Sequence, residues 1–117
     1  MRYMCLIYDN EQTWAKMSKA EADAIMGEYF AFTKDIRNSG HYQAGEALQA
    51  VSTATTVRVR DSKLSTTDGP FAETKEYLGG FYLINARDLN EAIQIASRIP
   101  SARFGSVEVR PVVEFNH

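Results

Sequence analysis

The stretch that carries most of the residue types needed for chemistry is 68–80, DGPFAETKEYLGG. Asp68 and Gly69 form a turn pair, and Pro70 restricts the backbone before it, so the Asp68 carboxylate is predicted to be held rigidly. A rigid carboxylate can act as a general base or anchor a ligand. It can equally organise the turn by accepting hydrogen bonds from the following backbone N–H groups. On the catalytic alternative, Asp68 and Glu73 are the candidate acids.

Three basic residues are candidates for binding an anionic ligand. Lys75 lies between acidic neighbours, where it could hold an anionic group or take part in a solvated set of ion pairs contributing roughly 0–1 kcal/mol. Arg110 is expected on the charged face of the last strand, where its planar guanidinium could bind both oxygens of a carboxylate. The alternative is an ion pair with Glu108. Arg58, on another predicted strand, is the third candidate for binding an anion.

Aromatic residues and glycines could add a pocket to these charges. The aromatic candidates are Tyr3, Tyr8, Tyr29, Phe32, Tyr77 and Tyr82. Gly79 and Gly80 either let the backbone approach a ligand or relieve a bulge at the start of a strand.

Periodicity and turn signals predict the elements that must position these residues. Ser18 begins a capping box, Gly40 is a suitable helix stop, and Asp88 repeats the capping pattern. Residues 9–17 are expected to form a polar loop. The predicted order is strand 2–8, helix 18–40, hairpin strands 53–60 and 64–67, strand 80–86, helix 88–99 and strand 106–115. The buried stripe of the second helix is predicted as Leu89, Ala92, Ile93, Ala96 and Ile99.

This order is the split βαβ plan of a ferredoxin-like α+β domain with an added hairpin. Two helices can cover only one face of a four-stranded sheet. The other face is expected to combine apolar residues of the first strand with charged ones, Arg58, Arg60, Glu108 and Arg110. Such a face is too apolar to be exposed to solvent and too charged to be buried as an ordinary core. Packing against a second copy would satisfy both conditions, so a homodimer with twofold symmetry and a polar cleft is predicted.

Composition excludes several classes of function. The 117 residues suit a single domain over 1–117, and a net charge of −2 with scattered basic residues speaks against a nucleic-acid partner. One cysteine, Cys5, permits no internal disulfide, and no metal site or cofactor motif is expected. No apolar run approaches a membrane span, and the first residues lack a signal-peptide pattern, so a cytoplasmic location is predicted.

The motif DGPFAETKE, followed by LGGFYLI, LNEAIQIASRIP and SVEVRP, resembles the YCII-related proteins of the DGPF type over nearly the whole chain. The resemblance implies a ferredoxin-like fold that dimerises into an α+β barrel. Relatives are small bacterial proteins, mostly of unassigned function, and some are encoded beside extracytoplasmic-function sigma factors. A His–Asp pair has been proposed as catalytic in the broader group, with the histidine on the first helix. The matching position here is Tyr29, so that pair is not carried over intact, and Asp68 is the candidate for its acidic member.

Two functions remain open from the sequence. The first is acid–base chemistry, an isomerisation or elimination, on a small anionic or aromatic compound, with Asp68 as base and Lys75 and Arg110 as anion binders. The second is a non-catalytic module that binds a metabolite or regulates a partner such as a sigma factor. The second needs a pocket or a surface patch, but no activated acid.

Overall fold

The computed structural model describes residues 1–115, and strand β1 (Arg2–Asp9) lies at the centre of its main sheet. Both faces of β1 carry apolar residues, which is typical of an internal strand. All neighbours pair antiparallel. The sheet order is β2 (Tyr42–Ala47), β5 (Tyr77–Asn85), β1 and β6 (Ser106–Pro111). This order, with the helix connections, confirms the predicted ferredoxin-like α+β fold.

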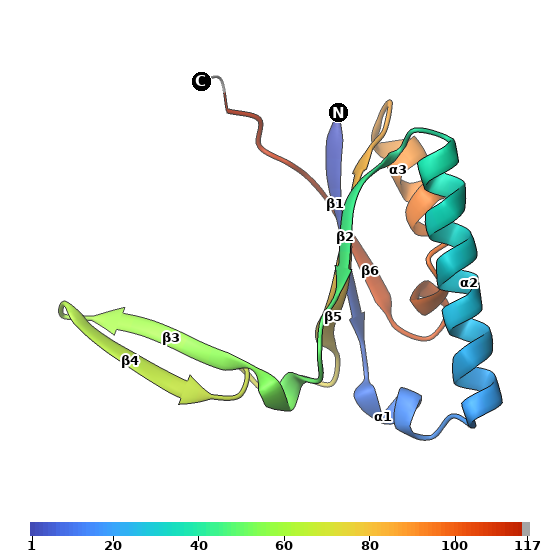
Figure 1. Cartoon of the computed structure of the whole chain (residues 1–117). Helices are drawn as coiled ribbons and strands as arrows, with labels where there is room; N and C mark the ends of the chain where they lie inside the picture. The colour runs from blue at the N-terminus through green and yellow to red at the C-terminus, as the bar shows by residue number, and fades with distance from the viewer. Residues whose placement is uncertain (116–117) are drawn as a thin grey trace.

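Two helices cover one face of this sheet (Figure 1). Helix α2 (Lys19–Asn38) begins at Ser18, whose hydroxyl oxygen accepts the Glu21 N–H. Helix α3 (Leu89–Ala96) begins at Asp88, whose carboxylate accepts the Glu91 N–H. Both caps occur where the sequence predicted them, because each satisfies an N–H group that the first helical turn leaves free. Short helices complete the chain: α1 (Glu11–Ala15), η1 (Val51–Thr53) and η2 (Pro100–Arg103).

The core lies between the sheet and these helices. Every second residue of β1 points into it, and Tyr3, Cys5 and Ile7 are buried. They pack with residues of α2, β5 and the α3 region: Phe32, Ile36, Tyr82, Ile84, Ala92, Ile95 and Ile99. Tyr29, from α2, packs against the edge of this cluster. No helix within residues 1–115 is long and apolar enough to cross a bilayer.

Strand β2 was missed by the sequence reading, which assigned no element there. Its sequence, YQAGEA, has small and polar residues and therefore no clear alternation. β2 is nevertheless held as an edge strand by its pairing with β5, for example Gly45 opposite Tyr82. A side chain at Gly45 would lie 2.8 Å from the Tyr82 ring, so packing against β5 explains this glycine.

The predicted hairpin forms a separate two-stranded sheet of β3 (Thr55–Arg60) and β4 (Lys63–Asp68). Asp61 and Ser62 both have positive φ, as expected for a two-residue hairpin turn. Figure 1 shows the hairpin projecting from the side of the main sheet that faces away from the helices. The expectation that Arg58 and Arg60 share the sheet face of Glu108 is therefore wrong, because both belong to the hairpin.

Three smaller predictions need correction. Residues 9–17 contain helix α1 rather than only loop. Strand β6 ends at Pro111, because β1 begins at Arg2, whose carbonyl oxygen accepts a last bond from the Val112 N–H at 3.0 Å; Val113 is exposed. In α3 the buried stripe includes Ile95, whereas Leu89 and Ile93 are exposed.

The sheet face opposite the helices is left open. Met4, Leu6 and Tyr8 of β1 lie on it and are only half-buried, and Phe81 pairs with Leu6 on the same side. Glu108 and Arg110 of β6 also lie there, as predicted, and they form an ion pair at 2.7 Å.

Candidate functional site

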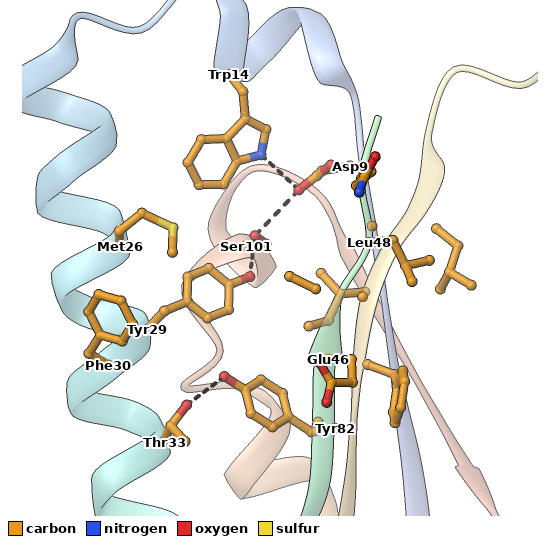
Figure 2. Close-up of a pocket in the computed structure, with 18 of the residues that line it drawn as sticks. Asp9, Trp14, Met26, Tyr29, Phe30, Thr33, Glu46, Leu48, Tyr82 and Ser101 are labelled. Atoms are coloured by element: carbon orange, nitrogen blue, oxygen red, sulfur yellow. Dashed lines mark hydrogen bonds between the residues drawn. The ribbon is translucent and has the colours of Figure 1, made fainter. Parts of the chain in front are cut away.

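A cavity of about 930 Å³ lies between α2 and the β2–β5 side of the sheet (Figure 2). Its wall on α2 is made by Met26, Tyr29, Phe30, Thr33, Lys34 and Arg37. The opposite wall comes from β2, the segment that follows it, and the first half of β5. At one end lie Asp9 of β1, Glu11 and Trp14 of α1, and Ser101 of η2. Its volume is in the range of small-molecule sites.

Asp9 is the chemically most distinctive residue of this cavity. It ends the row of buried β1 residues that includes Cys5 and Ile7, so its carboxylate enters the layer beneath the helices and is only 9% exposed. The indole Nε1–H of Trp14 donates to Asp9 Oδ2 at 2.9 Å. The hydroxyl of Ser101 donates to the same oxygen over a longer 3.5 Å. Figure 2 shows these bonds at one end of the cavity.

The second carboxylate oxygen of Asp9 has no hydrogen-bond donor in the part of the chain that the structure describes. Within residues 1–115 no hydrogen bond reaches Oδ1, and no basic side chain forms an ion pair with Asp9. Every fully buried side-chain oxygen in that range does have a partner, so Oδ1 is not fully buried. A carboxylate that is largely buried without a cation is costly, and such groups concentrate at functional sites.

Tyr29 is linked to Asp9 through Ser101. The Tyr29 and Ser101 hydroxyl oxygens are 2.5 Å apart, and Ser101 is fully buried. Because Ser101 donates its proton to Asp9, Tyr29 must donate to Ser101. Burial raises the pKa of Tyr29, although the hydrogen bond to Ser101 acts in the opposite direction. Tyr29 therefore stays protonated at neutral pH. Its hydrogen bond orients the Ser101 hydroxyl so that Ser101 donates to Asp9.

Tyr82 and Thr33 form a second hydroxyl pair in the cavity, at 2.7 Å. Burial raises the pKa of Tyr82, so its phenol is also neutral near pH 7. Only one of the two hydroxyl protons is used between them, whichever residue donates. The other proton has no acceptor among residues 1–115 and can bond an oxygen atom of a ligand.

Gly79 and Gly80 line the cavity, and the bulge alternative for this pair is confirmed. Ile7 pairs with Gly80 while Tyr8 pairs with Leu78, so Gly79 is the extra residue of a β-bulge. A Cβ at Gly79 would lie 3.6 Å from Asp9 Oδ1. The end of the motif thus brings backbone beside the carboxylate.

The acidic candidates from the motif lie outside this cavity. Asp68 ends β4, is exposed, and makes no side-chain hydrogen bond within residues 1–115, so the turn-organising bonds considered for it are absent there. Gly69 has a φ of +99°, not the extended backbone expected before Pro70. Glu73 is exposed as well. A catalytic role for Asp68 and Glu73 stays a prediction.

The predicted anion binders are also separated from the cavity and from one another. Lys75 is exposed in the loop before β5. Arg110 lies on the open sheet face, in its ion pair with Glu108. Arg58 lies on the hairpin, where its guanidinium makes a long 3.5 Å contact with the Phe71 carbonyl oxygen. None of the three lines the cavity, and ligand binding by them stays a prediction.

Asp9, Trp14 and Ser101 were missed by the sequence reading. A signal for Asp9 was present, because it continues the alternating row of Cys5 and Ile7 by one position. Trp14, the only tryptophan, stood out in a polar segment. Ser101 had no signal, since only the folded chain brings it near position 9. Of the predicted aromatic pocket, Tyr29, Tyr77 and Tyr82 line the cavity, but Tyr3, Tyr8 and Phe32 do not.

No group of three or more metal-ligating side chains occurs within residues 1–115. The polar side chains of the cavity include hydroxyl, indole and carboxylate groups at the Asp9 end and the cations Lys34 and Arg37 further along α2. Their arrangement suits binding a small molecule and moving a proton on it.

Comparison with known proteins places the chain in a family. The model of the YCII-related domain matches residues 1–116. The uncharacterized protein R00369 of Rhizobium meliloti (strain 1021) is 36% identical over 114 residues, which cover 96% of this chain and 92% of that protein. Both matches span almost the whole length and therefore include every residue of the cavity. The chain belongs to the YCII-related family.

Proposed function

We propose that the cavity is the active site of a small-molecule enzyme of the isomerase or lyase type, in which Asp9 is the general acid–base. The observation that carries the proposal is the asymmetry of the Asp9 carboxylate. Oδ2 is held by Trp14 and Ser101, whereas Oδ1 has no partner within residues 1–115. A general base needs this combination of a fixed orientation and one free oxygen.

The chemical step is a proton transfer. Asp9 Oδ1 takes a proton from a carbon next to a carbonyl group, which leaves an enolate, and later returns a proton to the same or a neighbouring position. The spare hydroxyl proton of the Thr33–Tyr82 pair, which lies further along the cavity from Asp9 (Figure 2), can bind another oxygen atom of the ligand. No other co-reactant is required.

The test is deuterium exchange into enolisable ketones in D₂O, followed by ¹H NMR. The probes are acetophenone, 4-acetylphenylacetate and 4-acetylphenylacetamide, whose acetyl methyl signal disappears as exchange proceeds. The wild-type protein is expected to accelerate exchange of at least one probe. Asp9→Asn, which preserves size and the acceptor for Trp14, should reduce that acceleration by about 10²–10⁴-fold.

Asp68→Asn is the matched control, because it makes the same chemical change at the acid that the sequence predicted. If Asp68→Asn abolishes exchange and Asp9→Asn does not, the base is Asp68 and the proposal for Asp9 is wrong. If a probe binds in the cavity but no probe exchanges faster than in buffer, the non-catalytic metabolite-binding alternative replaces the enzyme.

We also propose that the chain works as a homodimer, with the open sheet face covered by a second copy. The support is the half-buried apolar row of Met4, Leu6 and Tyr8. The hairpin leaves on the same side of the sheet and presents Val57 and Leu64, which are 59% and 70% exposed. A two-stranded hairpin is marginally stable alone, so an additional packing surface is expected. A cytoplasmic location stays a prediction from the sequence.

A further inference from the structure

The charged groups of the cavity are separated along helix α2. Asp9 and Trp14 lie at one end, near Tyr29. Lys34 and Arg37 also line the cavity and are three positions apart, so they share a face of the helix further along it. With a rise of about 1.5 Å per residue, the backbone of Arg37 lies roughly 12 Å along the helix from that of Tyr29.

Lys34 and Arg37 have no acidic partner within residues 1–115. Other arginines of the helix layer do: Arg98 pairs with Asp35, and Arg103 pairs with Glu28 at 2.6 Å. The Arg37 guanidinium instead lies over the Tyr42 ring, 4.5 Å from its centre. Both cations are exposed, and two cations on a cavity wall without a carboxylate partner in residues 1–115 can bind an anion. A guanidinium supported by an aromatic ring is well oriented for a carboxylate.

The wall between the two ends is apolar and aromatic. Met26 and Phe30 line it although they are 41% and 70% exposed, which is unusual for such side chains unless something covers them. Tyr29 extends the surface toward Asp9, whereas Tyr82 lies beside Thr33, further from Asp9 (Figure 2). The remaining cavity acids are Glu46, which is exposed, and Glu11, which accepts the Val51 N–H at 2.6 Å.

We infer that the cavity takes a monocarboxylate with a flat apolar body. The carboxylate binds Arg37 and Lys34, and the body lies against Phe30 and Tyr29. The end remote from the carboxylate then reaches Asp9. What happens at that end rests on the proposed function, whereas the binding of the carboxylate does not.

Arg37 could instead have a purely structural role. It covers Tyr42 and lies in the last turn of α2, where a cation is favourable. A structural Arg37 would affect the binding of charged and neutral ligands equally. The ratio of the two affinities is therefore the quantity to measure.

The experiment is a binding titration followed by Trp14 fluorescence, which reports directly because the chain has one tryptophan and it lines the cavity. The probes are 4-acetylphenylacetate and its neutral isostere 4-acetylphenylacetamide. The carboxylate is expected to bind at least about tenfold more tightly than the amide, because its hydrogen bonds to Arg37 and Lys34 are charge-assisted. Equal affinities, or no binding of either probe, would overturn the inference.

Variants of Lys34 and Arg37 test whether these two cations cause the preference for the carboxylate over the amide. Arg37→Gln and Lys34→Gln should each reduce the carboxylate-to-amide preference several-fold, and Arg37→Lys should retain most of it. Lys19→Gln is the matched control, since it removes a charge from α2 at an exposed ion pair with Asp23, outside the cavity. A preference that survives both cavity substitutions, or that falls equally in the control, would show that these cations do not bind the ligand.

The two proposals can fail separately. In Asp9→Asn the preference for the carboxylate should persist while deuterium exchange is lost. Binding with the expected preference but without exchange in the wild type contradicts only the enzyme. Exchange that is equally fast for acid and amide, with equal affinities, contradicts only the anion site.

Discussion

At the scale of single residues, Gly105 shows how tightly the Asp9 end of the cavity is built. A Cβ at Gly105 would lie 2.3 Å from the Tyr8 carbonyl oxygen and 2.9 Å from Asp9 Cβ, neither of which can move without shifting β1. Gly105→Ala should therefore lower the free energy of unfolding by about 1–3 kcal/mol. Urea denaturation measures this change.

Gly27 provides the control for the same substitution. It lies in the interior of α2, and a Cβ there would meet nothing within 4 Å. Gly27→Ala is expected to raise stability by about 0.5–1 kcal/mol, because alanine favours the helix. Destabilisation by both variants to the same extent would mean that the close approach at Gly105 is not the cause.

Cys5 is expected to make the free energy of unfolding fall as the pH becomes alkaline. Burial raises the pKa of its thiol from about 9.0 to about 11, so the folded protein holds the proton longer than the unfolded chain does. Stability should be unaffected by Cys5 below about pH 9 and should fall as the pH rises from 9 toward 11, by roughly 2–3 kcal/mol. Urea unfolding at several pH values would measure this loss.

Cys5→Ala lacks the titrating group, so its alkaline loss of stability should be shallower than that of the wild type. Tyr29 and Tyr82 titrate in the same direction in both proteins and therefore cancel in the comparison. Identical slopes for the two proteins would contradict the assignment to Cys5. Iodoacetamide should also label the native thiol far more slowly than the unfolded one.

At the scale of elements, the hairpin β3–β4 is independent of the main sheet. Within residues 1–115 its strands pair only with each other, and its two ends are already adjacent, since Gly69 N–H donates to the Ala54 carbonyl oxygen at 2.7 Å. Replacing residues 55–68 by a Gly-Ser pair should change the intrinsic stability by less than about 1 kcal/mol. Circular dichroism and urea unfolding at low protein concentration check this.

The comparison protein carries the same Gly-Ser pair inserted between Asp61 and Ser62, which lengthens the turn and keeps the hairpin. It should behave like the wild type. Loss of cooperative unfolding in the shortened protein alone would show that the hairpin belongs to the folding unit.

At the scale of the whole molecule, the chain is more extended than its length requires. Its radius of gyration is 16.3 Å, whereas scaling predicts roughly 13 Å for a compact domain of this size. Figure 1 shows the cause, because the hairpin and the segment after β6 both leave the main body. Together with the open sheet face, this shape favours association with a second copy.

A charge on the open face tests that association. The wild type is expected to be a dimer by light scattering at micromolar concentration. Leu6→Glu places a carboxylate in the centre of the proposed interface and should produce a monomer. Leu89→Glu makes the same change at an exposed position of α3 and should leave the dimer intact. A monomeric wild type would contradict the dimer directly.

The sequence by itself determined the elements whose signals are local. A short run that is apolar on both faces placed β1, and the side-chain oxygens of Ser18 and Asp88 marked the starts of both covering helices, because capping depends on neighbours three residues apart. The order of these elements then led to the ferredoxin-like fold. Strand β2 was not predicted, because its small and polar residues show no alternation. It is an edge strand that is stabilised by pairing with β5.

Only the tertiary structure decided where the candidate site lies. The motif of residues 68–80 attracted attention through its charges, yet Asp68, Glu73 and Lys75 are exposed outside the cavity. Its contribution to the cavity is the uncharged segment 77–80. Asp9, Tyr29 and Ser101 are far apart in the chain, and they meet because the end of β1, helix α2 and η2 converge on one point. Burial of a carboxylate is a property of that convergence, so no local pattern could reveal it.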